Sequence, residues 1–226
     1  MTVIRDEYDR QGTPPVTARE AIVEPVRQYY EARLAEHGAT PGGVDWNSAA
    51  SQRLRFEQFE RLFADWQDPR IVDYGCGYGA LVDYLRGRGR AWDYVGFDVS
   101  QAMIDAARTR HAGDPRARFV GDRSSVEPGD LAVASGVFNV RLEVSDPAWF
   151  DYLIETIRDL ASLGRRGFAF NALTSYSDRD KQRPDLYYAD PRALFDFCKR
   201  TFSKHVALLH DYQLYEFTIV VRAEAR

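Results

Sequence analysis

From about residue 70 onward, short apolar runs alternate with longer stretches that have helical periodicity. This alternation constrains the fold most, because a strand–helix–strand order favours parallel strands with helices on both faces of a sheet. The last two apolar runs lack a helical stretch between them, and residues 210–215 are few enough for a hairpin. We therefore expect an α/β fold with a seven-stranded, mostly parallel sheet and an antiparallel last strand. The apolar runs are 70–74, 94–98, 117–120, 131–134, 167–170, 206–209 and 217–221, and the helical stretches are 80–86, 101–110, 147–163 and 191–202.

A helical extension is predicted before the first strand. Residues 1–15 are polar and are expected to form a frayed leader. From Thr17, apolar residues recur every three or four positions, and Gly38 ends the pattern. A second helix is expected over 48–65. The sequence thus divides into an N-terminal helical extension, 1–65, which we expect to act as a lid, and an α/β domain, 66–226.

Composition excludes several classes of protein. The net charge is −4, whereas a nucleic-acid partner would favour a basic face. No apolar run approaches the roughly 18 residues of a membrane helix. The two cysteines, Cys76 and Cys198, cannot by themselves form a disulfide framework or a zinc site. We expect a cytoplasmic protein with reduced thiols, no resident metal and no membrane partner.

The strongest motif is the glycine cluster that ends the first apolar run and opens a helix. Gly75, Gly77 and Gly79 follow one another at every second position. Glycines allow a tight turn and let the backbone approach a ligand closely. Asp73 precedes the first glycine by two residues, and a carboxylate there suits a cationic ligand better than a pyrophosphate. A plain tight turn is the alternative interpretation.

Two further acids end the next two apolar runs. Asp98 lies 19 residues after Gly79, where a carboxylate can accept hydrogen bonds from both hydroxyls of a ribose. A helix cap is its alternative role, although Ser100 already suits that role. Asp122 follows the third run and can accept a hydrogen bond from an adenine amine, or simply shape a turn. Ligands bind at the carboxyl ends of parallel strands, so the three acids are expected to share one edge.

Together, Asp73-x-Gly75-x-Gly77-x-Gly79, Asp98 and Asp122 resemble the class I S-adenosylmethionine-dependent methyltransferases, from about residue 68 to the C-terminus. In that family the glycine loop passes the methionine portion of the cofactor, the second acid holds the ribose and the third acid faces the adenine. The resemblance implies the same roles for Gly75, Gly77 and Gly79, then Asp98, then Asp122. The resemblance also implies six further residues of the cofactor site: Asp73, Cys76, Val99, Met103, Arg123 and Ser135. Met103 matches a position that often packs on the adenine ring, and a core methionine is its alternative role.

The acceptor is expected at the same edge. The strand order brings His210 there as a candidate base and Asn139 as a group that could orient the acceptor. The alternative for His210 is a half-exposed histidine in a turn. Further candidates for acceptor contact are Arg141, Tyr176 and Tyr187, with Tyr29, Tyr30 and Trp46 from the lid. An aromatic face can accept a sulfonium or an aromatic substrate, although these rings could equally pack helices onto the sheet.

The leading hypothesis is an S-adenosylmethionine-dependent methyltransferase acting on an oxygen or nitrogen atom of a small molecule. A nicotinamide-dependent oxidoreductase also uses a glycine loop and an acid after the second strand, but Asp73 would face a pyrophosphate. A non-catalytic S-adenosylmethionine-binding protein is a second alternative. Methylation of protein or RNA is a third, which the acidic charge disfavours.

Overall fold

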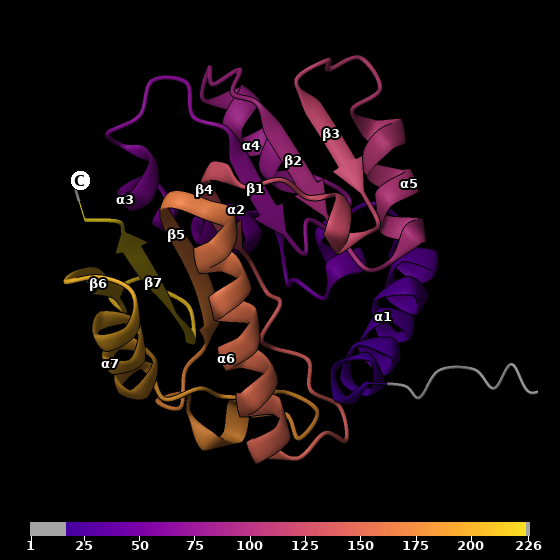
Figure 1. Ribbon diagram of the computed structural model, residues 1–226. Helices are drawn as coiled ribbons and strands as arrows, with labels where there is room; N and C mark the ends of the chain where they lie inside the picture. Colours follow the sequence, from indigo (N-terminus) through magenta and orange to yellow (C-terminus); the bar gives the residue numbers. More distant parts are fainter. Residues whose placement is uncertain (1–16, 225–226) are drawn as a thin grey trace, which may run out of the picture.

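A computed structural model of the chain describes residues 17–224, in which seven strands form one sheet in the order β3-β2-β1-β4-β5-β7-β6 (Figure 1). The strands β1 to β5 are mutually parallel, and β7 pairs antiparallel with both β5 and β6. The predicted fold class is therefore confirmed. The strands are β1 (Ile71–Tyr74), β2 (Tyr94–Phe97), β3 (Ala117–Val120), β4 (Gly129–Ala134), β5 (Gly164–Leu173), β6 (His205–Leu209) and β7 (Glu216–Arg222).

Helices cover both faces of the sheet, each over its own hydrophobic core. One core packs beneath α6 and α7, and the other beneath α2, α3, α4 and α5. The helices are α1 (Ala18–His37), α2 (Ala49–Gln58), α3 (Glu60–Phe63), α4 (Ala80–Gly87), α5 (Gln101–Arg110), α6 (Asp146–Leu163) and α7 (Pro191–Thr201), with short 3-10 turns η1 (Pro41–Val44), η2 (Arg123–Ser125) and η3 (Arg179–Lys181).

The extension before β1 differs from its prediction in one respect. The single helix expected over 48–65 is divided at Phe59 into α2 and α3. Phe59, Leu62 and Phe63 are all fully buried, and a tightened turn at Phe59 directs their three side chains into one core. The predicted leader, 1–15, and the first part of the predicted lid lie outside the described residues.

Helix α1 is well formed but weakly packed. It begins with a capping box between Thr17 and Glu20 and ends at Gly38, which has φ 67°. Pro25 interrupts its hydrogen bonding from within, and no residue of this helix is buried in the described structure. It lies beyond the carboxyl ends of β1 and β3, near α5 and α6 (Figure 1). Helix α1 therefore contributes little to the hydrophobic core.

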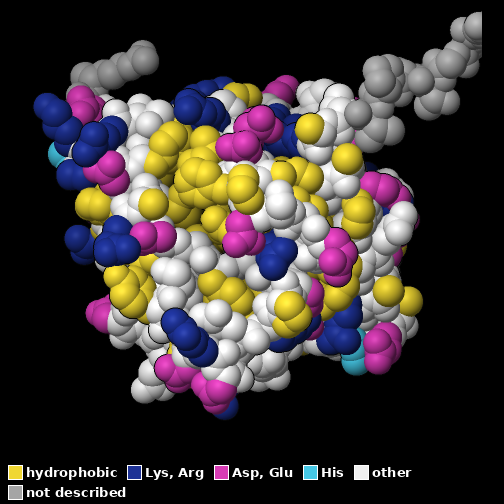
Figure 2. All heavy atoms as spheres, turned by 90° about the horizontal axis from the view of Figure 1, so that it is seen from below, with side chains coloured by type: hydrophobic (Ala, Val, Ile, Leu, Met, Phe, Trp, Pro, Cys, Tyr) yellow, Lys and Arg dark blue, Asp and Glu magenta, His cyan; other side chains and the backbone are white. Residues whose placement is uncertain are grey.

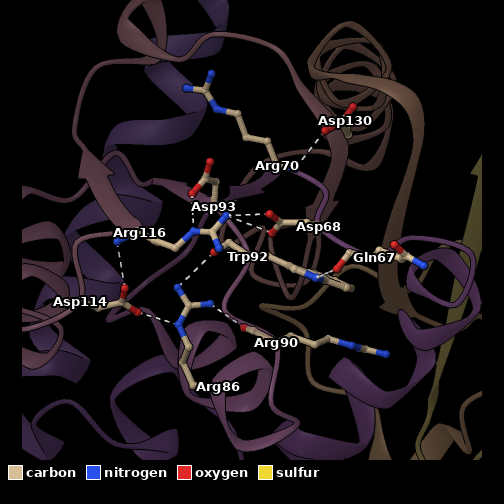
Figure 3. A network of polar contacts seen from close by, with 10 residues as sticks. All are labelled: Gln67, Asp68, Arg70, Arg86, Arg90, Trp92, Asp93, Asp114, Arg116 and Asp130. Carbon is tan, nitrogen blue, oxygen red and sulfur yellow. Dashed lines mark hydrogen bonds and ion pairs between the residues drawn. The ribbon is translucent and has the colours of Figure 1, made fainter.

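The amino edge of the sheet is tied by a polar network (Figure 3). The Arg86 guanidinium donates to Asp114 at 2.6 Å and to the carbonyls of Arg90 and Trp92 at 2.7 and 3.1 Å. Arg116 pairs with Asp68 at 3.0 Å and Asp93 at 2.7 Å. These contacts hold the loops that lead into the strands at the amino edge. The cavity described below lies at the opposite, carboxyl edge.

Between residues 17 and 224, no helix is both long enough and apolar enough to cross a membrane.

Candidate active site

A cavity of about 560 Å³ lies at the carboxyl edge, between the ends of β1, β2 and β4 and the inner side of α1. Figure 2 shows this edge from outside, with a group of hydrophobic side chains bordered by acidic and basic ones. The structure brings these residues of the predicted site together in the cavity wall: Tyr30, Trp46, Asp73, Gly75, Cys76, Gly77, Asp98, Val99, Met103, Arg123 and Ser135.

The glycine loop lies so close to its neighbours that a side chain is disfavoured at two of its positions. A Cβ at Gly75 would lie 2.4 Å from Val137 Cγ2, and one at Gly77 would lie 3.2 Å from Val44 Cγ1. Both residues also have positive φ, 77° and 53°. The bare backbone therefore forms the floor of the cavity.

Asp98 is half-buried at the cavity wall, and its carboxylate is held by the backbone. Its Oδ2 accepts from the Gly77 N–H and its Oδ1 from the Ser100 N–H, both at 2.9 Å. Burial raises the pKa of Asp98, while these two hydrogen bonds oppose the rise. Ser100 caps α5 as expected, by accepting from Met103 N–H at 3.2 Å. Each Asp98 oxygen keeps lone-pair capacity for a ligand hydroxyl.

Asp73 is buried under the loop and accepts a 2.5 Å hydrogen bond from the Tyr94 hydroxyl. Burial raises the pKa of Asp73 to about 7, although the Tyr94 bond acts in the opposite direction. The carboxyl is thus poised to ionise near neutral pH. A cationic ligand in the cavity would favour the ionised form.

The upper wall is apolar and aromatic. Ile22, Val23 and Val26 of α1 face the cavity, together with the rings of Tyr30 and Trp46. Tyr30 is half-buried, and the loss of water around its phenol raises the pKa, which keeps the phenol neutral. Such walls exclude water and can accept a sulfonium against an aromatic face.

Eight of the predicted site residues do not line the cavity: Tyr29, Gly79, Asp122, Asn139, Arg141, Tyr176, Tyr187 and His210. Gly79 instead opens α4, where a Cβ would lie 2.9 Å from the His111 ring. Asp122 is exposed and caps η2 by accepting from Ser124 N–H at 2.8 Å.

The two predicted catalytic residues have other surroundings. Asn139 is buried, and its Oδ1 accepts from the Leu173 N–H at 3.2 Å, so its side chain braces the end of β5. His210 is exposed, with its ring 5.7 Å from that of Tyr176 and 6.1 Å from that of Phe217. Tyr29 donates to Asp45 at 2.8 Å, outside the cavity.

Sequence reasoning missed several wall residues. Gln52 and Phe56 of α2 line the cavity, and their i, i+4 spacing was a signal that both share one helix face. Tyr74 and Tyr152 also line it, from β1 and α6. Asn171 accepts from the Gly136 N–H at 3.0 Å and so shapes the loop after β4, but no local motif marks it.

Within residues 17–224, no group of three or more His, Cys, Asp or Glu side chains could hold a metal ion. The cavity combines four acidic residues, Glu20, Asp73, Asp98 and Asp159, with a glycine-lined floor and apolar walls, which suits an organic ligand.

Comparisons with known proteins agree with this geometry. A family model described as a methyltransferase domain matches residues 71–162. The Mycobacterium tuberculosis (strain ATCC 25618 / H37Rv) protein "Putative methyltransferase Rv1506c" is 57% identical over 152 residues, which are 67% of this chain and 92% of that protein. Trans-aconitate 2-methyltransferase of Variovorax paradoxus (strain S110) is 36% identical over 96 residues, 39% of this chain and 36% of that enzyme. The solved structure of magnesium protoporphyrin IX methyltransferase from Synechocystis PCC 6803 with bound SAM has a TM-score of 0.63 at 14% identity, over 94% of this chain and 100% of that one.

Proposed function

The chain belongs to the class I S-adenosylmethionine-dependent methyltransferases, and from that premise we propose that it methylates an oxygen or nitrogen atom of a small-molecule acceptor. The observation that carries the proposal is the cavity of about 560 Å³, which lies within the range of roughly 300–1,000 Å³ typical of small-molecule sites. Its walls come from α1, α2 and the carboxyl ends of the strands, and they enclose the space around the glycine loop.

The residues present fit S-adenosylmethionine. The side-chain-free floor at Gly75 and Gly77 leaves room for its methionine portion, and the exposed lone pairs of Asp98 suit the two ribose hydroxyls. Asp73 offers negative charge beneath the same loop. Met103, Val99 and Arg123 complete the proposed site on the adenine side.

The cofactor, when bound, supplies a methyl group on a sulfonium. The chain's own part is to bind, orient and exclude water. Trp46 and Tyr30 border the cavity with aromatic rings, and the Asp98 carboxylate fixes the position of the ligand relative to the loop after β4. Positioning of this kind can account for much of the rate of methyl transfer.

The lid is proposed to be α1 rather than the whole extension. Its apolar residues face the cavity while none is buried, so closing it over a ligand would bury them. In contrast, α2 buries Gln52, Arg55 and Phe56 and is part of the fixed wall. Hydrogen exchange in 18–37 should slow when cofactor binds.

Two calorimetric titrations test the cofactor. S-adenosylhomocysteine should bind and NAD should not. Binding of NAD without binding of S-adenosylhomocysteine would support the oxidoreductase alternative. Binding of S-adenosylhomocysteine with no methyl transfer to any acceptor class would support the non-catalytic one.

The acceptor class is tested with cofactor radiolabelled in the methyl group. Small-molecule, protein and RNA fractions of a cell extract are offered separately, with heat-inactivated enzyme as control. We expect label in the small-molecule fraction alone. A tricarboxylic acid panel is a sensible first set, because one relative is a trans-aconitate 2-methyltransferase. Label confined to RNA or protein would overturn the small-molecule proposal.

A further inference from the structure

A buried ion pair joins the N-terminal extension to the last strand. The Arg55 guanidinium of α2 donates to Glu216 of β7 through Nε at 2.8 Å and Nη2 at 2.6 Å. The two side chains are only 7% and 1% exposed. They are separated by 161 positions in the chain, so the pair spans the extension and the sheet.

Stability alone does not explain this pair. Removing two charges from water offsets most of their attraction, and apolar replacements of such pairs are often neutral or stabilising. Arg55 Nη1 is also buried without a hydrogen-bond partner in the described structure, which adds to the cost. The contacts of the Arg55 guanidinium outside the ion pair indicate a geometric role instead.

The guanidinium covers the Trp46 ring. Its central carbon lies 3.7 Å from the ring centroid, the shortest such distance in the described residues. The indole also lies close to Gly136, where a Cβ would lie 2.4 Å from Trp46 Cζ2. Gly136 is in turn held by Asn171, whose Oδ1 accepts its N–H at 3.0 Å. The indole thus contacts both an ion-paired guanidinium and a hydrogen-bonded loop.

Trp46 and Gly136 both line the cavity, beside Ser135 and the glycine loop. The next step rests on the proposed function: the loop after β4, which contains Ser135 and Gly136, would face the methyl-donor end of the cofactor. We propose that Arg55 and Glu216 are positioning residues, which fix the Trp46 indole as the rigid wall of the acceptor compartment. Closure of α1 then changes the roof of the compartment and leaves this wall in place.

The chain contains a matched control. Arg90 pairs with Glu60 through two hydrogen bonds of 2.7 Å and lies 4.7 Å from the Trp92 ring centroid. Neither Arg90 nor Trp92 lines the cavity. The same combination of charges and indole therefore occurs away from the site.

The test uses the full chain labelled with 5-fluorotryptophan, which gives one fluorine resonance for each of the four tryptophans. Trp46→Phe assigns the resonance of interest. In the ligand-free protein, Arg55→Lys should move or broaden the Trp46 resonance and leave the Trp92 resonance unchanged, whereas Arg90→Lys should do the reverse. A Trp46 resonance that stays sharp and unshifted in Arg55→Lys would overturn the proposal.

An apolar pair separates positioning from folding. Arg55→Met with Glu216→Leu should retain the melting temperature of the wild type and still broaden the Trp46 resonance. If the double variant keeps the wild-type resonance, packing alone holds the indole and the proposal fails. The double variant also provides the test if Arg55→Lys does not fold.

Titration with S-adenosylhomocysteine keeps the two proposals distinct. Arg55→Lys should bind it within about threefold of the wild type, because the pair acts on the acceptor side. Loss of more than about tenfold would assign Arg55 to the cofactor instead. If the wild type itself binds none, the proposed function fails, while the ligand-free spectra still decide the role of Arg55.

Discussion

At the scale of single residues, two carboxyl groups at the glycine loop have different tasks because their environments differ. Asp98 faces the cavity and is braced by two backbone N–H groups. Asp73 is buried beneath the loop with one hydroxyl donor. The first is suited to bind hydroxyls and the second to respond to charge.

Asp98→Ala should weaken S-adenosylhomocysteine binding by at least about tenfold, because charge-assisted hydrogen bonds are worth roughly 1.5–3 kcal/mol each. Calorimetry measures the change. Asp122→Ala is the matched control, since Asp122 also caps a turn after a strand but is exposed outside the cavity. Equal losses in both variants would mean that Asp122 contacts the adenine, as the sequence suggested.

At alkaline pH, the ligand-free Asp73→Asn variant should be more stable than the ligand-free wild type. Burial raises the pKa of Asp73 from 3.8 to about 7 in the folded state, so its contribution is fully present below pH ~4 and is lost as pH rises through 7. The asparagine variant has no such loss. Its advantage in free energy of unfolding should grow by about 2 kcal/mol between pH 5.5 and 8.

Urea denaturation at the two pH values measures this gap for wild type and variant. A gap that is the same at both pH values would show that Asp73 ionises normally. The same variant should lose more affinity for the cationic S-adenosylmethionine than for the neutral S-adenosylhomocysteine, since only the former carries a sulfonium.

The local motifs were sufficient to predict Asp73, Gly75, Gly77 and Asp98 at the cavity, because strand ends and glycine turns are encoded by neighbouring residues. Residues that reach the site through long-range packing were not predictable. Tyr152 comes from the middle of α6, where its periodicity resembles that of any buried helical residue.

At the scale of elements, α1 combines good caps with a proline in its interior. Pro25→Ala should stabilise the helix, since proline inside a helix costs about 3 kcal/mol relative to alanine. We expect amide hydrogen exchange in 18–37 to slow by tenfold or more, as about 1.4 kcal/mol corresponds to tenfold. Exchange in β1 and β4 should stay as it is.

Exchange followed by mass spectrometry on peptides from 18–37 gives the result, with β4 peptides as the internal reference. Unchanged protection in α1 would indicate that this helix opens as a body rather than by fraying. Slower methyl transfer in the variant would connect opening of α1 with release of product.

Periodicity was sufficient to predict each strand and most helices, because one apolar face or run reports burial directly. It did not predict the break at Phe59. The apolar pattern continues through it, and the turn arises only when Phe59, Leu62 and Phe63 meet one core.

At the scale of the whole molecule, the two edges of the sheet have separate roles. The amino edge holds the polar network of Arg86, Asp114 and Arg116, and the carboxyl edge holds the cavity (Figure 3). Stability and binding should therefore respond to different substitutions.

Arg86→Met should lower the free energy of unfolding by about 1–3 kcal/mol, because two carbonyl groups and Asp114 lose their donor. Binding of S-adenosylhomocysteine should stay unchanged. Arg116→Met, which removes more exposed ion pairs, should lower the free energy of unfolding by less than Arg86→Met does. Weakened ligand binding in Arg86→Met would show that the edges are coupled.

The position of α1 has a consequence for synthesis. This helix is translated before every strand of the sheet, yet Arg19 contacts Tyr74, 55 positions later, and Asp159, 140 positions later. During translation, α1 lacks its Asp159 partner until α6 has been made. The pocket therefore acquires its roof only after the strands β1 to β4 and the helix α6 have been translated.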